Sequence, residues 1–322
     1  MIKEKVLEAH KKILAAENIL LVTHDRPDGD ALSSICSMME FLQVNNKKYF
    51  AYCLDQPPYQ FNFLPNVDRI IFDKSQLDFS KHDLIIALDC GSLNRTNLAR
   101  EISGRQSWQF VIEFDHHPRT DNYADLELRE VSSSSTAEVL YNFFKENSVR
   151  FDKRLANCIL TGILTDTGNL LYESTSEKTI KIASEMMIYG ARFPIILENT
   201  WRNKSLPAMR IWGEALSNLQ INKYYNFAFS ILTKDNLKET SATEEELEGI
   251  AGFLSNLYGV NGVVFLRELE GKGKIKGSLR TTHPKVNISK LAEVLGGGGH
   301  RRASGFVIEG SLVETEKGWR IV

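Results

Sequence analysis

A short acidic stretch constrains this chain more than any other feature of its sequence. An apolar run at residues 19–22 (ILLV) leads into the segment 23–31 (THDRPDGDA), and apolar residues at helical spacing then extend to residue 44. This pattern predicts a buried strand, a tight loop and the start of a helix. In open α/β sheets, binding sites form just outside the carboxyl ends of the strands, where this loop is expected to lie.

The same loop offers one imidazole and three carboxylates within seven residues. His24, Asp28 and Asp30 are spaced so that a turn after the strand can direct all three side chains into one pocket. An imidazole with oxygen donors suits Mn²⁺, Fe²⁺, Co²⁺ or Zn²⁺, and two metal ions could share so many ligands. The alternative interpretation is a turn rich in Pro, Asp and Gly that only caps the following helix. The loop by itself leaves both interpretations open.

The bulk properties of the sequence are those of an ordinary globular protein. At 322 residues the chain is long enough for about two domains, and its 43% apolar and 25% charged residues are typical of soluble proteins. The net charge of −2 excludes a generally basic nucleic-acid-binding surface but not a local basic patch. Four scattered cysteines without a Cys-x-x-Cys motif favour a reduced, cytoplasmic protein over a disulfide framework or a zinc ribbon.

Nothing in the sequence predicts a membrane protein. Residues 1–14 have the spacing of an amphipathic helix rather than the pattern of a signal peptide. No apolar run approaches the ~20 residues that a membrane-spanning helix needs. We therefore expect a soluble, cytoplasmic protein.

The first half of the chain alternates strand and helix patterns. Apolar runs at residues 49–54, 70–72, 83–89 and 109–114 predict strands, and this alternation predicts a parallel sheet covered by helices on both faces. The strand 83–89 ends in Asp89, and the strand 109–114 is followed by Asp115, His116 and His117. Together with the loop after residue 22, these strand ends should line one edge of the sheet.

Helical patterns follow at residues 136–147, 153–165 and 177–189. Asp166 comes at the end of the second of these otherwise apolar helices, where a buried carboxylate is costly unless it is paired or bound to metal. The alternative, a helix-end Asp in a glycine-rich turn, is favoured for this residue taken alone. A break at residues 190–194 and a connecting helix at 206–220 mark a domain boundary.

The remainder of the chain has an α/β pattern of its own. Strands are predicted at residues 224–232, 261–269 and 275–281, helices at 244–258 and 288–295, and a hairpin turn at 271–273. Residues 267–302 contain nine Lys and Arg against three Glu, a local net charge of +6 in a slightly acidic chain.

Four consecutive glycines at residues 296–299 precede His300 in this basic region. Glycines allow close backbone approach, and their N–H groups can cradle a phosphate. The alternative is a flexible linker, although such linkers are rarely flanked by an apolar helix and a His-Arg-Arg sequence. The loop lacks the Gly-Lys-Ser/Thr ending of a nucleotide P-loop, which argues against ATP hydrolysis.

Several motifs taken in order resemble those of the DHH phosphoesterase superfamily. They are His24-x-x-Pro27-Asp28-Gly29-Asp30, the triplet Asp115-His116-His117, and a glycine-rich signature at residues 296–305 that resembles the GGGH motif of the DHHA1 domain. The usual Ala-Ala-Gly after that motif is Ala303-Ser304-Gly305 here, a small change. The resemblance covers essentially the whole chain, and the chain length and short linker resemble the bacterial oligoribonuclease/pAp phosphatase (nanoRNase A-like) branch.

This resemblance implies an α/β fold with two domains. An N-terminal DHH domain (1–192), with a parallel sheet and helices on both faces, would be joined by a helical linker (193–215) to a smaller α/β DHHA1 domain (216–322). The active site would lie in the cleft between the two domains.

The resemblance also implies roles for the residues at the strand ends. It implies two divalent metal ions, expected to be Mn²⁺, whose mutual repulsion is offset by several carboxylates. Asp89 would be shared by both ions, His117 would contact the scissile phosphate and stabilise charge there, and Asp115 would orient a histidine. The implied metal ligands are His24 and Asp28 on one ion, Asp30, His116 and Asp166 on the second, and Asp89 on both.

In the C-terminal domain, the resemblance implies that Arg280, Gly298, Gly299 and His300 hold the substrate. Arg280 would make bidentate contacts to a phosphate that is not cleaved. A cleft of this kind would limit the substrate to a few nucleotides.

The function implied is degradation of very short RNA to mononucleotides and dephosphorylation of 3′-phosphoadenosine 5′-phosphate (pAp) to AMP. One alternative is a phosphodiesterase for linear or cyclic dinucleotides such as pApA and c-di-AMP. Another is a non-catalytic nucleotide- or RNA-binding module. Manganese pyrophosphatases share the N-terminal motifs but have a different C-terminal signature. We expect short RNA and pAp as partners, no membrane and no obligate protein partner, and the sequence leaves the oligomeric state open.

Overall fold

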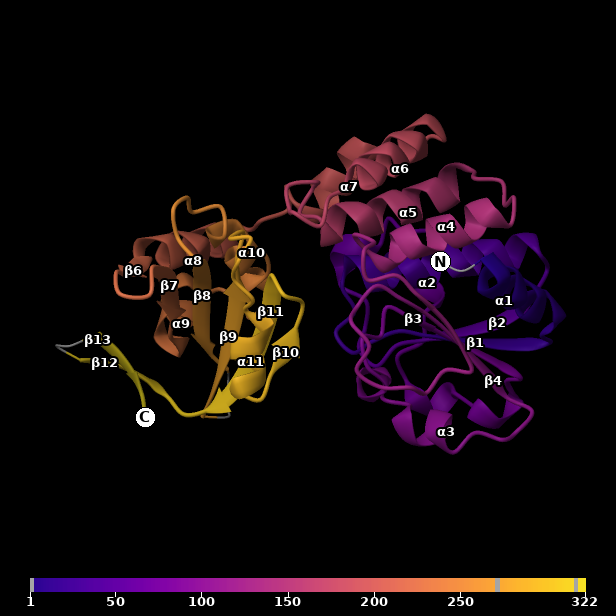
Figure 1. Ribbon diagram of the computed structural model, residues 1–322, viewed down its shortest axis with the longest axis horizontal. Helices are drawn as coiled ribbons and strands as arrows, with labels where there is room; N and C mark the ends of the chain where they lie inside the picture. Colours follow the sequence, from indigo (N-terminus) through magenta and orange to yellow (C-terminus); the bar gives the residue numbers. More distant parts are fainter. Residues whose placement is uncertain (1–2, 270–272, 316–317) are drawn as a thin grey trace. The chain divides into compact units, whose positions relative to one another are not determined.

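A computed structural model describes residues 3–269, 273–315 and 318–322. The chain divides into two compact units, Met1–Asn203 and Lys204–Val322, and each has its own sheet and its own core (Figure 1). No helix within the described ranges is long and apolar enough to span a bilayer.

The first unit is built on a five-stranded sheet in which all neighbouring strands are parallel. This confirms the predicted parallel α/β architecture. The strand predicted at residues 70–72 is wrong, because one-turn helices on either side leave only Ile71 to form a single bridge with Tyr52. The last strand of the sheet was not predicted. In spatial order the strands are β2 (Lys48–Tyr52), β1 (Asn18–Val22), β3 (Leu84–Leu88), β4 (Phe110–Asp115) and β5 (Leu126–Arg129).

The strand order creates a switch point between β1 and β3. The chain passes from β1 to β2 on one side and then crosses to β3 on the other side of β1. Ligands of open α/β sheets bind at the carboxyl ends of the strands at such a point. The loops that leave β1 and β3 are those that carry the acidic stretch and Asp89.

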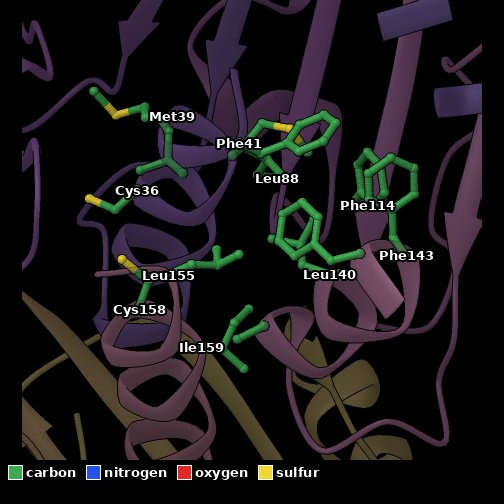
Figure 2. Packing of buried hydrophobic residues seen from close by; sticks show 14 of the residues in the cluster. Cys36, Met39, Phe41, Leu88, Phe114, Leu140, Phe143, Leu155, Cys158 and Ile159 are labelled. Carbon is green, nitrogen blue, oxygen red and sulfur yellow. The ribbon is translucent and has the colours of Figure 1, made fainter. Parts of the chain in front are cut away.

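Helices cover both faces of this sheet, as predicted. On one face, Phe41, Phe143 and the strand residue Phe114 are part of the larger core (Figure 2). On the other face, a short helix and one-turn helices pack against a smaller core. The helices are α1 (Lys3–Ala15), α2 (Gly29–Val44), α4 (Thr136–Glu146) and α5 (Lys153–Asp166) on the first face, α3 (Ala99–Ser103) on the second, and α6 (Glu177–Ile188) and α7 (Phe193–Thr200) packed on α5.

The second unit has a six-stranded mixed sheet in which only the pairing of β7 with β8 is parallel. The helix predicted at residues 244–258 is wrong: Gly249, with φ of +90°, separates the one-turn helix Glu245–Leu247 from a short α10. The turn predicted at 271–273 lies largely outside the described residues. The elements are α8 (Leu206–Ser217), β6 (Gln220–Asn222), β7 (Phe227–Leu232), α9 (Lys234–Thr240), α10 (Ile250–Leu254), β8 (Gly262–Glu268), β9 (Lys274–Arg280), α11 (Ser289–Val294), β10 (Gly298–Gly299), β11 (Ala303–Glu309) and a hairpin of β12 (Leu312–Thr315) with β13 (Gly318–Ile321).

Candidate active site

Three neighbouring strands of the first sheet end in residues that the sequence singled out. His24 lies two residues after β1, Asp89 directly follows β3, and Asp115 is the last residue of β4. Because these strands are parallel neighbours, their carboxyl ends meet at one edge of the sheet. The structure therefore brings together side chains from segments that are far apart in the sequence.

One group of side chains with the spacing of metal ligands contains His24, Asp28 and Asp89. Nε2 of His24 is 3.8 Å from Oδ2 of Asp28 and 3.8 Å from Oδ2 of Asp89. Asp28 is also the N-cap of α2, and its Oδ1 accepts hydrogen bonds from the backbone N–H groups of Asp30 and Ala31. The same carboxylate therefore caps the helix with one oxygen and presents the other to His24, so the two interpretations of this loop are compatible.

A second group contains Asp30, His116 and Asp166. Nε2 of His116 is 3.4 Å from Oδ2 of Asp166, 4.0 Å from Oδ2 of Asp30 and 3.8 Å from Oδ1 of Asp89. Asp89 thus lies between the two groups, with Oδ2 toward His24 and Oδ1 toward His116.

Backbone carbonyl groups orient both histidines. Nδ1 of His24 donates to the carbonyl of Asp25 at 2.6 Å, and Nδ1 of His116 faces the carbonyl of Ser133 at 3.4 Å. These contacts place the proton on Nδ1 and leave each Nε2 as a lone-pair donor directed at the carboxylates. Metal-binding histidines are held in the same way in other proteins.

The N-terminus of α4 also points into the site. The backbone N–H of Thr136 donates to Oδ2 of Asp30 at 2.6 Å, and the N–H of Ala137 donates to Oδ1 of Asp30 at 2.9 Å. The hydroxyl of Thr136 donates to Oδ1 of Asp89 at 2.8 Å. Sequence analysis missed Thr136, because the serines before it indicate a helix start but not what that start faces.

His117 is hydrogen-bonded to Asp115, and its Nδ1 also lies 3.5 Å from Oδ1 of Asp89. Oδ1 of Asp115 accepts hydrogen bonds from the backbone N–H of His117 at 2.8 Å and from its Nδ1 at 2.9 Å. Arg129, at the end of β5, donates to the carbonyl of His117 at 2.5 Å and lies 3.7 Å from Oδ2 of Asp115. Although burial lowers the pKa of His117, the hydrogen bond and charge of Asp115 outweigh it and raise that pKa. The ring is thus biased toward its cationic form.

Two glycines allow α2 and α5 to pack closely beside the site. A Cβ on Gly29 would lie 2.4 Å from Cγ2 of Thr165, and a Cβ on Gly162 would lie 2.6 Å from Oδ1 of Asp30. These distances are well inside van der Waals contact, so any larger residue would force the helices apart. The close packing brings Asp166, at the end of α5, to Asp30, at the start of α2.

The carboxylates of the site need a positive counter-charge. Burial, and then the charge of Asp166, raises the pKa of Asp30 to about 7. Burial, and then the charges of Asp30 and Asp28, raises the pKa of Asp89 well above its usual value. Divalent cations would supply the missing charge and keep these groups ionised. Two imidazoles with four carboxylates fit two such ions of the Mn²⁺, Fe²⁺, Co²⁺ or Zn²⁺ kind.

We expect the stabilisation of the protein by Mn²⁺ to increase with pH. Because the pKa of Asp30 is raised from 3.8 to about 7, its contribution to the stability of the metal-free protein is fully present below about pH 4 and is lost as the pH rises to about 7. Mn²⁺ binds the ionised form, so the difference in Tm between Mn²⁺-loaded and chelated protein should be larger at pH 8 than at pH 6. Thermal unfolding measured with and without a chelator would test this.

Asp30→Asn provides the control for this measurement. The variant has no carboxyl group to titrate at this position, so the Tm of its chelated form should depend less on pH. A wild-type Mn²⁺ effect of the same size at both pH values would contradict the expectation.

The four residues expected to hold substrate lie where β9 ends and β11 begins, and on the edge strand β10 beside β11. Arg280 is the last residue of β9, half-buried, and pairs in register with Ala303 of β11. His300 precedes β11, and its backbone N–H donates to the carbonyl of Ala303 at 2.9 Å. Gly298 and Gly299 form the exposed edge strand β10 rather than a flexible linker.

The fold and this arrangement agree with matches to known protein families. The model of the DHH family N-terminal domain matches residues 18–163, and the model of the DHHA1 domain matches residues 225–317. The chain belongs to the DHH/DHHA1 phosphoesterase family, a class of hydrolases.

Individual relatives match over nearly the whole chain. The chain is 30% identical over 305 residues to the bifunctional oligoribonuclease and PAP phosphatase NrnA of Bacillus subtilis, covering 94% of this chain and 92% of the relative. It is 29% identical to the protein of the same name from Thermus thermophilus, covering 91% and 84%. Among solved structures, an exopolyphosphatase-related protein from Bacteroides fragilis aligns with a TM-score of 0.85 at 27% identity, covering 94% of this chain and 90% of the other.

Proposed function

We propose that this protein is a Mn²⁺-dependent phosphohydrolase that degrades very short RNA to mononucleotides and converts pAp to AMP. The relatives from B. subtilis and T. thermophilus are named for both activities and match over most of this chain. The observation that carries the proposal is the position of Asp89, whose two carboxylate oxygens face His24 and His116 from between the two groups. A carboxylate in that position suits a ligand shared by two ions.

Each of the proposed metal ligands in the first unit then has a role. His24 and Asp28 would hold one ion, Asp30, His116 and Asp166 would hold the second, and Asp89 would be shared. Two bound ions supply a nucleophilic water and neutralise charge on the phosphoryl oxygens. The mixture of imidazole and carboxylate donors is compatible with Mn²⁺.

His117 would act on the substrate. Its Nδ1 is engaged by Asp115, and in the cationic ring Nε2 also carries a proton that would be donated to an oxygen of the scissile phosphate. The side chain of His117 is 27% exposed, whereas that of His116 is 8% exposed, so His117 is the more accessible of the two to a ligand. Charge that develops on that oxygen during hydrolysis would be stabilised by the cationic imidazole.

In the second unit, Arg280, Gly298, Gly299 and His300 would hold the part of the substrate that is not cleaved. Their support is their place on the neighbouring strands β9, β11 and β10 or next to them, and the local net charge of +6 over residues 267–302. A guanidinium suits bidentate contact with a phosphate.

A substrate panel tests the proposal. Purified protein with Mn²⁺ would be assayed on pAp, pApA, c-di-AMP, pyrophosphate and RNAs of two to five nucleotides. We expect AMP from pAp, mononucleotides from the RNAs, and little turnover of pyrophosphate. Preference for pApA or c-di-AMP would instead identify a dinucleotide phosphodiesterase, and tight metal binding without any hydrolysis would identify a binding module.

Arg280→Ala in the same panel separates oligonucleotide hydrolysis from general phosphoesterase chemistry. Loss of a charge-assisted contact should lower kcat/KM for pAp and short RNA by roughly 10- to 150-fold. Bis-p-nitrophenyl phosphate offers Arg280 no second phosphate, so its hydrolysis should remain almost normal. Equal losses on both kinds of substrate would mean that Arg280 supports the fold instead.

A further inference from the structure

Arg95 is a cation beside the candidate active site for which the sequence predicted no role. It lies in the one-turn helix Leu93–Thr96 that follows β3. Its backbone carbonyl accepts a hydrogen bond from the N–H of Asp25 at 2.7 Å, and its Nε lies 3.4 Å from Oδ1 of Asp25. Arg95 is therefore tied to the acidic loop between His24 and Asp28.

The guanidinium of Arg95 lies on the same side of Gly91 as His117. A Cβ placed on Gly91 would lie 3.3 Å from Nη1 of Arg95 and 3.5 Å from Cγ of His117. The N–H of Gly91 donates to Oδ2 of Asp115 at 2.7 Å, so the loop under both side chains is fixed. Two cationic groups thus flank one backbone position at the edge of the site.

Part of this guanidinium is available to a ligand. The Arg95 side chain is 40% exposed, and within the described part of the chain its Nη1 and Nη2 make no hydrogen bond.

A count of formal charges indicates what Arg95 could add. Four carboxylates and two divalent ions would leave the site neutral. A phosphodiester brings one negative charge. A terminal phosphate monoester carries about −1.5 to −2 at pH 7, so it gains more from a nearby guanidinium than a diester does.

We propose that Arg95, together with His117, binds the non-bridging oxygens of the scissile phosphate, and that its charge enables the site to accept a terminal phosphate as well as a phosphodiester. The inference rests on the proposed phosphoesterase function. It makes Arg95 a determinant of substrate specificity.

Arg95→Gln tests the proposal on two small esters that share a leaving group. p-Nitrophenyl phosphate presents a dianionic phosphate, and bis-p-nitrophenyl phosphate presents a monoanionic diester. Loss of a charge-assisted contact should lower kcat/KM for the monoester roughly 100-fold. Because Coulomb energy scales with the ligand charge, the diester should lose only about 10-fold. Equal losses on the two esters would overturn the proposal.

Two further variants separate the charge from its structural contacts. Arg95→Lys keeps the charge and should recover much of the monoester activity. Arg26→Gln is the matched control, because Arg26 pairs with the same Asp25 carboxylate but is 77% exposed. It should remain within about twofold of wild type on both esters. A loss in Arg26→Gln as large as in Arg95→Gln would mean that the Asp25 contacts, and not a phosphate contact, are responsible.

Binding of inorganic phosphate gives a readout that does not depend on turnover. Calorimetry on the Mn²⁺-loaded protein should show roughly 10-fold or more weaker phosphate binding in Arg95→Gln with unchanged metal content. Unchanged phosphate affinity would overturn the proposal. Since neither the small esters nor phosphate contains a nucleoside, failure of the RNA and pAp assays would count against the proposed function and leave this test intact.

Discussion

Asp89→Asn should abolish phosphoester hydrolysis and lower the content of bound metal at both groups of ligands. The carboxylate of Asp89 faces His24 with one oxygen and His116 with the other, so its neutralisation weakens both groups at once. Metal ions supply several kcal/mol of transition-state stabilisation, and a loss of about 4 kcal/mol corresponds to roughly 10³-fold in kcat/KM. Steady-state kinetics and metal analysis of the purified variant would measure the two effects.

The backbone of Asp89 makes Asn a better substitution than Ala. Its φ is +58°, a left-handed conformation that Asn tolerates better than most residues. The amide oxygen of Asn can also still accept a hydrogen bond from the hydroxyl of Thr136, so the fold should be retained.

Asp83→Asn is the matched control at the other end of the same strand. Its carboxylate accepts the backbone N–H groups of Glu17 and Asn18 at 2.8 and 2.7 Å and lies away from the site. This variant should keep its metal and its activity. Near-normal turnover by Asp89→Asn, or a full complement of metal in it, would contradict the assignment of a shared ligand.

His117→Ala should reduce turnover by roughly 10²–10³ while the metal content stays normal, the scale expected for one oriented donor to developing charge. The physical reason is that His117 is hydrogen-bonded to Asp115, whose hydrogen bond and charge raise the pKa of His117, whereas other residues are the proposed ligands of the two ions. Kinetics and metal analysis would again be compared.

His116→Ala is the informative contrast, because the two histidines are adjacent in the sequence and both lie near Oδ1 of Asp89, but they are proposed to have different roles. Nε2 of His116 points at Asp30, Asp89 and Asp166, so this variant should lose metal as well as activity. If His117→Ala lost as much metal as His116→Ala, the roles of the two residues would have to be exchanged or shared.

Much of the first unit could be predicted because its signals are local. The strands ending near Val22, Leu88 and Phe114 are almost entirely apolar, and each of these residues is followed within two positions by Asp or His. A run of that kind shows a buried parallel strand and its polar end without any knowledge of neighbours. Strand β5 was not predicted because its alternation of apolar and charged residues, from Leu126 to Arg129, is only four residues long.

The second unit shows where local patterns are insufficient. The apolar spacing over residues 244–258 is helical, yet Gly249 adopts a left-handed conformation and the segment divides into two short helices. A glycine within a helical pattern is compatible with either outcome, and packing against Trp212, which a Cβ on Gly249 would approach to 3.2 Å, favours the break.

The sequence by itself determined the fold class, the strand ends and the residue types available for metal and phosphate chemistry, because periodicity and residue chemistry are properties of short segments. Only the tertiary structure decided which of those residues meet. The grouping of His24 with Asp89 follows from the order of β1 and β3, and the approach of Asp166 to Asp30 follows from helices that pack closely at Gly162. The same holds for the placement of Arg95 beside His117. Such contacts depend on strand order and helix crossing, which are set by packing between segments distant in the chain and leave no local pattern.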